Sequence, residues 1–306
     1  MAGTLRRQLS RWNNIQRLSN VTVTDIVTHD GAAVGAVAIN ISNSEIVTFD
    51  AGAVILAAGG LTKLFRRNSA SANMAGEAYA LALRAGADLV DMEFVQFFPI
   101  AHLAPRLVGM DPIMWDPFRY KLGGRLLNGR FEEFIHSYGG TDNGNYSTVR
   151  DQACYAVIKE VEAGRGSPHG GVYLDFRHVP EEQLRSAFGP VIDRLLANGI
   201  DLTQTAVEVG PTAHYHMGGV RVSVKMETRL EGLYAAGEAV GGGNGANRLS
   251  GNAITEALVL GETAGRNAAD HAMKVCRRWE SRYAQQFVET TQVACSLRNP
   301  GRPAAL

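Results

Sequence analysis

The sequence predicts an α/β protein in which one domain is interrupted by an inserted α+β domain. An apolar run at 53–58 ends in two glycines, which is typical of a buried parallel strand whose end approaches a ligand. The pattern returns after residue 230, where a short apolar segment leads into a glycine-rich loop and a helix. Between them, proline, aromatic and turn residues cluster and two helices follow. The resulting boundaries are 1–99 and 208–275 for the discontinuous domain, 100–207 for the inserted domain and 276–306 for a C-terminal helical segment.

The other elements follow from hydrophobic periodicity and from turn residues. Alternating apolar and polar residues at 21–28 and 33–41 flank Asp30-Gly31, which is a strong hairpin signal. A third strand is expected at 45–49, before the buried apolar run. Helices are expected at 75–86, 148–163, 180–198 and 253–264.

Charge and composition argue against several classes of partner. Lys+Arg and Asp+Glu both number 30, so the net charge is zero and nucleic acid is not expected as a partner. No window approaches the roughly 20 apolar residues of a membrane span. Residues 1–18 predict an amphipathic basic helix without a signal-peptide core, more in keeping with a surface helix than with a mitochondrial presequence. We therefore expect a cytoplasmic protein.

Metal and disulfide chemistry have little support in the sequence. The cysteines show no close pair and no metal-ligand spacing, which predicts plain thiols: Cys154, Cys276 and Cys295. His214 and His216 would share one face of a strand, but no further ligand cluster accompanies them, so no metal site is expected.

The glycine-rich loop at 235–252 is the strongest local signal of function. Glycines let the backbone approach a ligand closely, and the helix that follows offers free N–H groups and a positive dipole. Glu238 and Arg248, both expected to be buried, lie near the two ends of this loop. A strand, a glycine loop and a helix start together predict an anion-binding cradle.

Seven segments resemble, in order and spacing, the fumarate reductase / succinate dehydrogenase flavoprotein family, which includes L-aspartate oxidase. The resemblance covers nearly all of residues 20–270 and implies an FAD-binding Rossmann-like domain with a capping domain that closes over a dicarboxylate site. The segments are Ala57-Ala58-Gly59-Gly60, Ala75-Gly76-Glu77-Ala78, residues 92–99, Gly123-Gly124-Arg125-Leu126-Leu127-Asn128, Arg150-Asp151, residues 214–219 and the glycine loop.

The sequence departs from the family pattern in two ways. The family's phosphate-binding turn and its long C-terminal helical domain have no counterpart here, so the flavin domain is expected to be incomplete at its N-terminus and to hold FAD weakly by itself. Phe98 stands where the family has a histidine before proline, and Tyr120 where it has its proton-delivering arginine. Arg119 is one position away and could substitute as the donor only if the loop shifts.

The resemblance implies a role for each candidate site residue. His214 and Arg248 match the carboxylate clamp, for which the planar fork of arginine is suited, and Arg119 with Tyr120 would deliver the proton. A structural ion pair for Arg248 and a core histidine at 214 stay open as alternatives. The cofactor-binding positions are Ala57, Gly59, Gly60, Glu77, Gly237, Glu238, Gly251, Asn252, Ala253 and Ile254.

The function implied is an FAD-dependent oxidoreductase that transfers a hydride between flavin and a small carboxylate or dicarboxylate. The alternatives are a carboxylate or amino-acid oxidase of the same family, and a non-catalytic partial flavoprotein chain. The second alternative requires a separate chain that supplies N-terminal FAD binding. Besides the substrate, the expected partner is that chain or an electron-transfer subunit, and no direct membrane insertion is expected.

Overall fold

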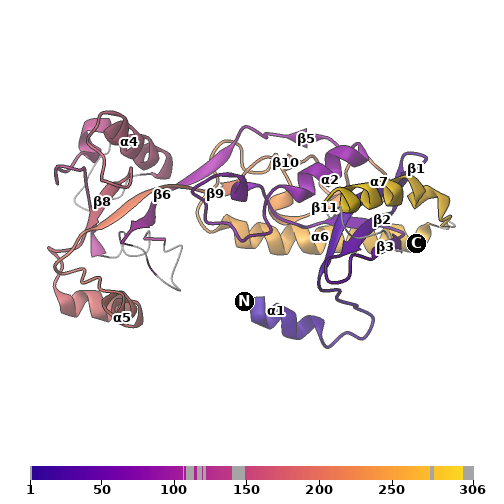
Figure 1. The fold of residues 1–306 in the computed structure, drawn as a ribbon, viewed down its shortest axis with the longest axis horizontal. Helices are drawn as coiled ribbons and strands as arrows, with labels where there is room; N and C mark the ends of the chain where they lie inside the picture. Colours follow the sequence, from indigo (N-terminus) through magenta and orange to yellow (C-terminus); the bar gives the residue numbers. More distant parts are fainter. Residues whose placement is uncertain are drawn as a thin grey trace.

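The structure, a computed structural model, describes residues 2–105, 107, 114–115, 119, 122–139, 149–275 and 279–298. Figure 1 shows two lobes joined by two long strands, β6 (Val95–Ala104) and β9 (Val207–His216), which pair antiparallel. One lobe contains the segments before β6 and after β9, and the other contains the segments between them. The predicted discontinuous α/β architecture is confirmed, while the exact domain boundaries stay a prediction.

An antiparallel sheet begins the first lobe. It has the order β1 (Val21–His29), β2 (Ala32–Asn40) and β3 (Ile46–Asp50). The predicted turn at Asp30-Gly31 is present, and both residues have positive φ angles of 48° and 75°. Helices α2 (Glu77–Ala85) and α7 (Arg282–Arg298) bury different residues of this sheet. Ile26, Ala33 and Ala36 lie in the core that includes α2, whereas Val27, Val34 and Val37 pack with α7.

The predicted parallel strand forms β4 (Val54–Leu56), which pairs in parallel with β11 (Leu233–Ala235). Full burial of the run is wrong, because Ile55 is 40% exposed. Among the described residues β11 is the only strand paired with β4, so a two-stranded sheet leaves one side of Ile55 uncovered. A further pair, β5 (Leu89–Val90) with β10 (Gly219–Val220), lies beside this sheet. Helix α6 (Asn252–Lys274) follows the glycine loop and runs further than predicted.

The second lobe has its own core. Its antiparallel sheet has the order β6-β9-β8-β7, in which β7 is Arg125–Leu127 and β8 is Val172–Asp175. Helices α4 (Arg150–Glu162) and α5 (Glu181–Ala197) correspond to the two predicted helices. Trp115, Phe176 and Leu195 are among the fully buried side chains of this core. The lobe is therefore packed as a unit, and β6 and β9 connect it to the first lobe.

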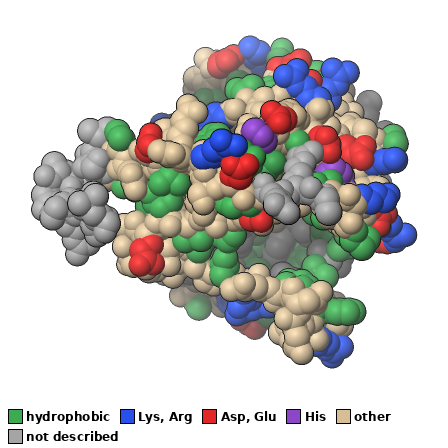
Figure 2. Space-filling model, turned by 90° about the vertical axis from the view of Figure 1, so that its right-hand side faces the viewer, with side chains coloured by type: hydrophobic (Ala, Val, Ile, Leu, Met, Phe, Trp, Pro, Cys, Tyr) green, Lys and Arg blue, Asp and Glu red, His purple; other side chains and the backbone are tan. Residues whose placement is uncertain are grey.

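The N-terminal helix α1 (Ala2–Leu9) is shorter than the predicted helix of residues 1–18. Its apolar residues remain exposed, including Leu5 at 46% and Leu9 at 48%. No helix in the described part of the chain is both long enough and apolar enough to span a membrane. On the face shown in Figure 2, acidic and basic side chains are interspersed.

Candidate functional site

The glycine loop lies between β11 and α6, as the sequence predicts. It opens with a short 3-10 helix, η3 (Gly237–Ala239), and Gly237 has a φ of 66°. Gly251 precedes α6 with a φ of 92°, which favours glycine, and no side chain caps the helix. Asn252 N donates to the Leu249 carbonyl at 3.3 Å, so the first-turn N–H groups of α6 that keep their donors for a ligand are those of Ala253 and Ile254.

Glu238 joins this loop to the glycines that follow β4. Its carboxylate accepts a hydrogen bond from the His216 backbone N–H at 3.0 Å. It also fills the space beside Gly60, where a β-carbon would overlap Glu238 Oε1. Burial raises the pKa of Glu238, while the His216 N–H and the positive charge of Arg248 act in the opposite direction. The site thus places a half-buried acid against bare backbone, which fits a polar ligand such as the hydroxyl chain of a flavin.

The loop that carries Gly59 and Gly60 also reaches the start of α2. The Gly60 carbonyl accepts a hydrogen bond from Gly76 N at 3.1 Å, and Gly59 has a φ of 78°. Glu77 is exposed, and its carboxylate accepts from Ala75 N at 2.9 Å, which closes the turn before α2. The structure therefore brings Gly59, Gly60, Glu77 and Glu238 to one region, next to Gly237.

A second group of residues, termed here the arginine cluster, comprises Gln96, Arg150, His214 and Arg248. Arg248 is 5% exposed and donates to Gln96 Oε1 at 3.0 Å and to the Leu249 carbonyl at 3.0 Å. Its guanidinium lies 4.3 Å from the centroid of the Tyr215 ring. Arg150 reaches Gln96 Oε1 at 3.5 Å. Two guanidinium groups thus converge on one amide oxygen.

Arg248 has no close ion-pair partner among the described residues, and the negative charges of Glu256 and Glu238 act on it only from beyond ion-pair distance. Within the described ranges, no carboxylate forms an ion pair with it, and its buried Nε has no hydrogen-bond partner. Burial lowers the pKa of Arg248, and the neighbouring Arg150 acts in the same direction. A structural ion pair therefore does not explain this residue, and a bound anion would supply the missing charge.

His214 lies beside the two arginines, on β9. Its Nδ1 is 2.8 Å from Ser69 Oγ. Burial lowers its pKa to about 4, and the positive charges of Arg150 and Arg248 contribute. The ring is therefore neutral at pH 7. His216, by contrast, has its ring nitrogens 2.8 Å from the Gly218 carbonyl and 3.1 Å from the Met92 carbonyl, so the two histidines do not form a metal-binding pair.

The remaining predicted site residues are Ala57, the four residues 251–254, Arg119 and Tyr120. Ala57 is exposed at the end of β4, and Gly251, Asn252 and Ile254 are exposed at the start of α6, with Ala253 half-buried. Arg119 is 2% exposed, its backbone N–H donates to the Trp115 carbonyl, and its carbonyl accepts from Gly123 N, each at 2.9 Å. Tyr120 lies outside the described residues.

The sequence interpretation did not assign functions to Gln96 and Arg150. Both lay within segments that carried the family resemblance, so the signal was present, but their convergence on Arg248 depends on contacts between distant segments. Gln96 is 152 residues from Arg248 in the chain. No local pattern encodes such a contact, which depends on the pairing of β6 with β9 and on the packing of the loop before α6 against Tyr215 of β9.

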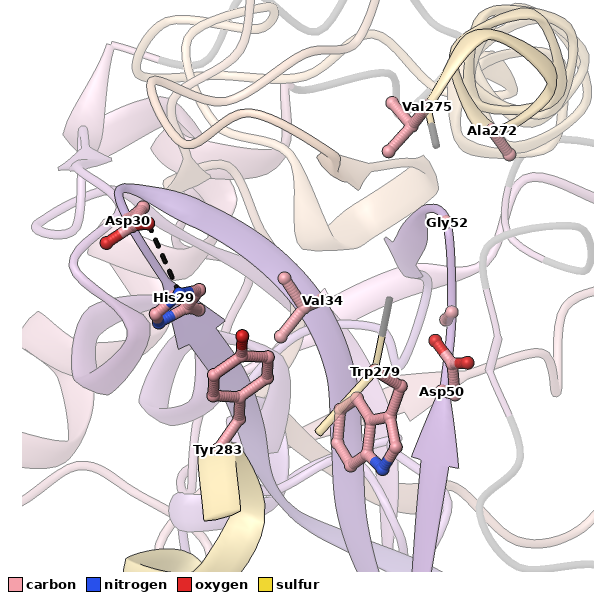
Figure 3. Close-up of a pocket in the computed structure, with 10 residues that line it drawn as sticks. His29, Asp30, Val34, Asp50, Gly52, Ala272, Val275, Trp279 and Tyr283 are labelled. Carbon is pink, nitrogen blue, oxygen red and sulfur yellow. Dashed lines mark ion pairs between the residues drawn. The ribbon is translucent and has the colours of Figure 1, made fainter. Parts of the chain in front are cut away.

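A cavity of about 470 Å³ lies elsewhere, between the β1–β3 sheet and the helices α6 and α7. Figure 3 shows Tyr283, Trp279 and His29 around it, with Asp30 and Asp50 at its rim. None of the predicted site residues lines this cavity. The candidate site is instead defined by the glycine loop and the arginine cluster.

The α/β lobe carries a glycine-rich loop at the start of a helix, and it joins the second lobe, termed here the capping lobe, at a buried arginine. This combination of fold and site is typical of a cofactor-dependent oxidoreductase. The FAD-binding domain model matches residues 1–254. The chain belongs to this FAD-binding family, which makes FAD its cofactor, as the sequence predicted.

Comparisons with individual proteins agree. The chain is 38% identical to a subunit of the fumarate reductase (CoM/CoB) of Methanothermobacter marburgensis over 278 residues, covering 91% of this chain and 50% of that protein. It is 32% identical to "L-aspartate oxidase 2" of Ralstonia nicotianae over 275 residues, covering 89% and 49%. The flavoprotein of E. coli quinol fumarate reductase matches with a TM-score of 0.85 and 31% identity, over 96% of this chain and 52% of that chain. This chain therefore spans about half the length of these relatives.

Proposed function

We propose that this chain is the substrate- and flavin-contacting part of an FAD-dependent oxidoreductase of the fumarate reductase / succinate dehydrogenase type. The reaction is hydride transfer between flavin and a small carboxylate. The observation that carries the proposal is the buried Arg248, whose Nε has no hydrogen-bond partner and with which no described carboxylate forms an ion pair. A substrate carboxylate matches both the charge and the fork of donors.

The four residues of the arginine cluster have distinct parts in this proposal. Arg248 binds the carboxylate, and Gln96 fixes the orientation of its guanidinium. The Nδ1 atom of neutral His214 is hydrogen-bonded with Ser69 Oγ. No described group hydrogen-bonds the Nε2 atom, which is therefore free to contact the substrate. Arg150 places a second positive charge nearby, which stabilises negative charge that develops on the carboxylate as hydride adds to the neighbouring carbon. Arg119 and Tyr120 remain the predicted proton donors.

The residues of the glycine loop fit a bound FAD. Gly60 and Glu238 offer bare backbone and an acceptor for hydroxyl groups, and the start of α6 offers N–H donors and a positive dipole. The bound flavin supplies the hydride, and an external electron donor restores it. The proposed partner is accordingly an electron-transfer subunit or a second FAD-binding chain, because the fumarate reductase relatives are named as subunits. A cytoplasmic location agrees with Cys154 and Cys295, which form no disulfide within the described part of the chain.

The test is the flavin spectrum of the purified chain after addition of FAD and of a small carboxylate. We expect the carboxylate to perturb the flavin absorption of the wild type, and Arg248→Gln to weaken its affinity at least about tenfold. Arg266→Gln, an exposed position on α6 that is 71% accessible, is the matched control. Equal affinity in all three proteins would remove Arg248 from the substrate site, and absence of FAD binding would favour the non-catalytic alternative.

An amino-acid oxidase is the second candidate, because an L-aspartate oxidase is among the relatives at 32% identity. Both activities need a clamp for a carboxylate, so the arginine cluster fits either. Product analysis separates them: an oxidase releases ammonia from L-aspartate in the presence of oxygen, whereas a reductase consumes an unsaturated acid with reduced dye.

A further inference from the structure

We propose that Ser69 is a positioning residue that fixes the ring proton of His214 on Nε2, so that this histidine meets a substrate carboxylate as a hydrogen-bond donor. The inference rests on the proposed function, because it concerns the same histidine and the same ligand. It assigns a role to a residue outside the arginine cluster, on the segment between β4 and α2.

The first step is the direction of the hydrogen bond between Ser69 and His214. Ser69 Oγ lies 2.8 Å from Nδ1 of His214 and 3.5 Å from the carbonyl oxygen of Ala213. If Nδ1 carried the proton and donated it to Oγ, the serine hydroxyl would turn to the carbonyl, which lies at the limit of hydrogen-bond distance. If the hydroxyl donates to Nδ1, its hydrogen forms a short bond with a good acceptor. The second arrangement is favoured, because a half-buried hydroxyl that leaves its donor poorly bonded loses free energy.

The second step is the consequence for the imidazole ring. Because burial and the charges of Arg150 and Arg248 lower the pKa of His214 to about 4, a single ring nitrogen carries a proton at pH 7. A donor bound to one nitrogen of a neutral imidazole places the proton on the other, so the proton of His214 lies on Nε2. A carboxylate only accepts hydrogen bonds. The Nε2–H form therefore binds it, whereas the opposite form would present a lone pair to it.

The third step is that the segment around Ser69 is held on both sides. Ser69 N donates to the Ala213 carbonyl at 3.0 Å, and Ala213 N donates to the Arg67 carbonyl at 2.9 Å, so the segment pairs with β9 immediately before the histidine. The side chain of Arg67 donates to two carbonyls of the capping lobe, those of His169 at 2.6 Å and Gly170 at 2.9 Å. These bonds fix the hydroxyl of Ser69 beside the ring before any ligand binds.

The proposed experiment locates the ring proton by NMR in the full chain with ¹⁵N-labelled histidine at pH 7, with FAD added and without it. The chain has 8 histidines, and the signals of His214 are assigned by their loss in His214→Gln. Correlations between the ring nitrogens and the carbon-bound ring protons distinguish a protonated nitrogen from an unprotonated one. In the wild type we expect an unprotonated Nδ1 and a protonated Nε2, and in Ser69→Ala we expect this preference to be lost. A proton on Nδ1 in the wild type would overturn the assignment, even if Ser69→Ala fails to fold.

Titration of fumarate into the FAD-loaded chain measures the effect on binding. Ser69→Ala should weaken the affinity for fumarate about tenfold, whereas Ser69→Thr keeps a hydroxyl and should keep both the ring form and the affinity. Ser71→Ala is the matched control, because it removes a hydroxyl of the same segment that donates to Asn73 Oδ1 at 2.7 Å, and it should change neither quantity. Weaker fumarate binding in Ser69→Ala without a change in the ring form would indicate a merely structural role and would overturn the assignment.

The outcomes separate this inference from the proposed function. Fumarate binding that is weakened by Arg248→Gln but not by Ser69→Ala would overturn the role of Ser69 and leave the proposed function intact. Fumarate binding that is absent, or that Arg248→Gln leaves unchanged, would overturn the proposed function and with it the donation from His214 to a carboxylate. In that case the NMR spectra still decide whether Ser69 fixes the ring proton, because they require no bound acid.

Discussion

The carboxylate of Glu238 packs directly against the backbone of Gly60, so that a β-carbon at residue 60 would overlap Glu238 Oε1. This contact joins the end of β4 to the glycine loop after β11, two segments that are distant in the sequence. It explains why residue 60 is glycine, since any larger residue would displace the acid from its hydrogen bond with His216 N.

Replacing Gly60 by alanine should therefore weaken FAD binding about tenfold and destabilise the fold by roughly 1–3 kcal/mol. Isothermal titration with FAD and chemical denaturation measure the two effects. Gly261→Ala is the control, because that glycine lies within α6 and a β-carbon there would meet nothing within 4 Å. The control should be neutral or slightly stabilising. Identical behaviour of the two variants would contradict the proposed contact.

In holoenzyme reconstituted with FAD and any partner chain, Arg248→Lys should reduce turnover on the order of a hundredfold and leave FAD retention nearly unchanged. Lysine preserves the positive charge but loses the planar fork that contacts Gln96 and would bind the carboxylate. Steady-state kinetics with reduced dye and gel filtration with absorbance detection measure the two quantities. Undiminished turnover would show that the guanidinium does not bind the substrate.

Carboxylate binding should become tighter as the pH falls from about 7 toward 4. In the free protein burial lowers the pKa of His214 to about 4, so the ring is neutral at pH 7. A bound carboxylate favours the protonated ring and raises that pKa, so binding takes up a proton between the bound-state and free-state pKa values. Below about 4 the affinity should level off, because the ring is then protonated in both states. Titrations at a series of pH values, with His214→Gln as the control, check this, and an unchanged slope in the variant would exclude His214.

The capping lobe should lose stability in acid through Glu160. Arg165 binds its carboxylate at 2.7 Å and 2.9 Å, and Tyr138 and Asn128 also donate to it. These hydrogen bonds hold the pKa of Glu160 at about 2, below its ordinary value of 4.5. A lowered pKa in the folded state means that the stabilisation is present above pH 4.5 and is lost as the pH falls toward 2.

Glu160→Gln should accordingly destabilise the protein at pH 7 by about 3 kcal/mol and flatten the acid limb of its stability profile. Urea unfolding between pH 2 and 7 measures this change. Glu162→Gln is the matched control, because Glu162 is 57% exposed and pairs only with Lys159 among the described residues. A steep acid limb in Glu160→Gln would mean that other carboxylates dominate.

The sequence by itself determined the α/β class, the family and its FAD cofactor, and the positions of most elements. These features depend on local signals: alternation gave the hairpin at residue 30, and helical periodicity gave α2, α4 and α5 within a few residues. The glycine loop was also visible, because glycine adopts positive φ angles without the strain that other residues meet, as Gly237, Gly242, Gly245 and Gly251 do here.

Only the tertiary structure decided which side chains meet. The pairing of β6 with β9, and the position of α4 beside them, bring Gln96, Arg150 and His214 to Arg248. Burial and charge at that junction set the neutral state of His214, and the apolar ring of Phe98 contacts both His214 and Arg150. Sequence periodicity reports which face of an element is apolar, whereas contacts between distant segments depend on how the elements pack. Ile55 shows the same limit, because its exposure follows from the number of strands beside β4 and not from its own hydrophobicity.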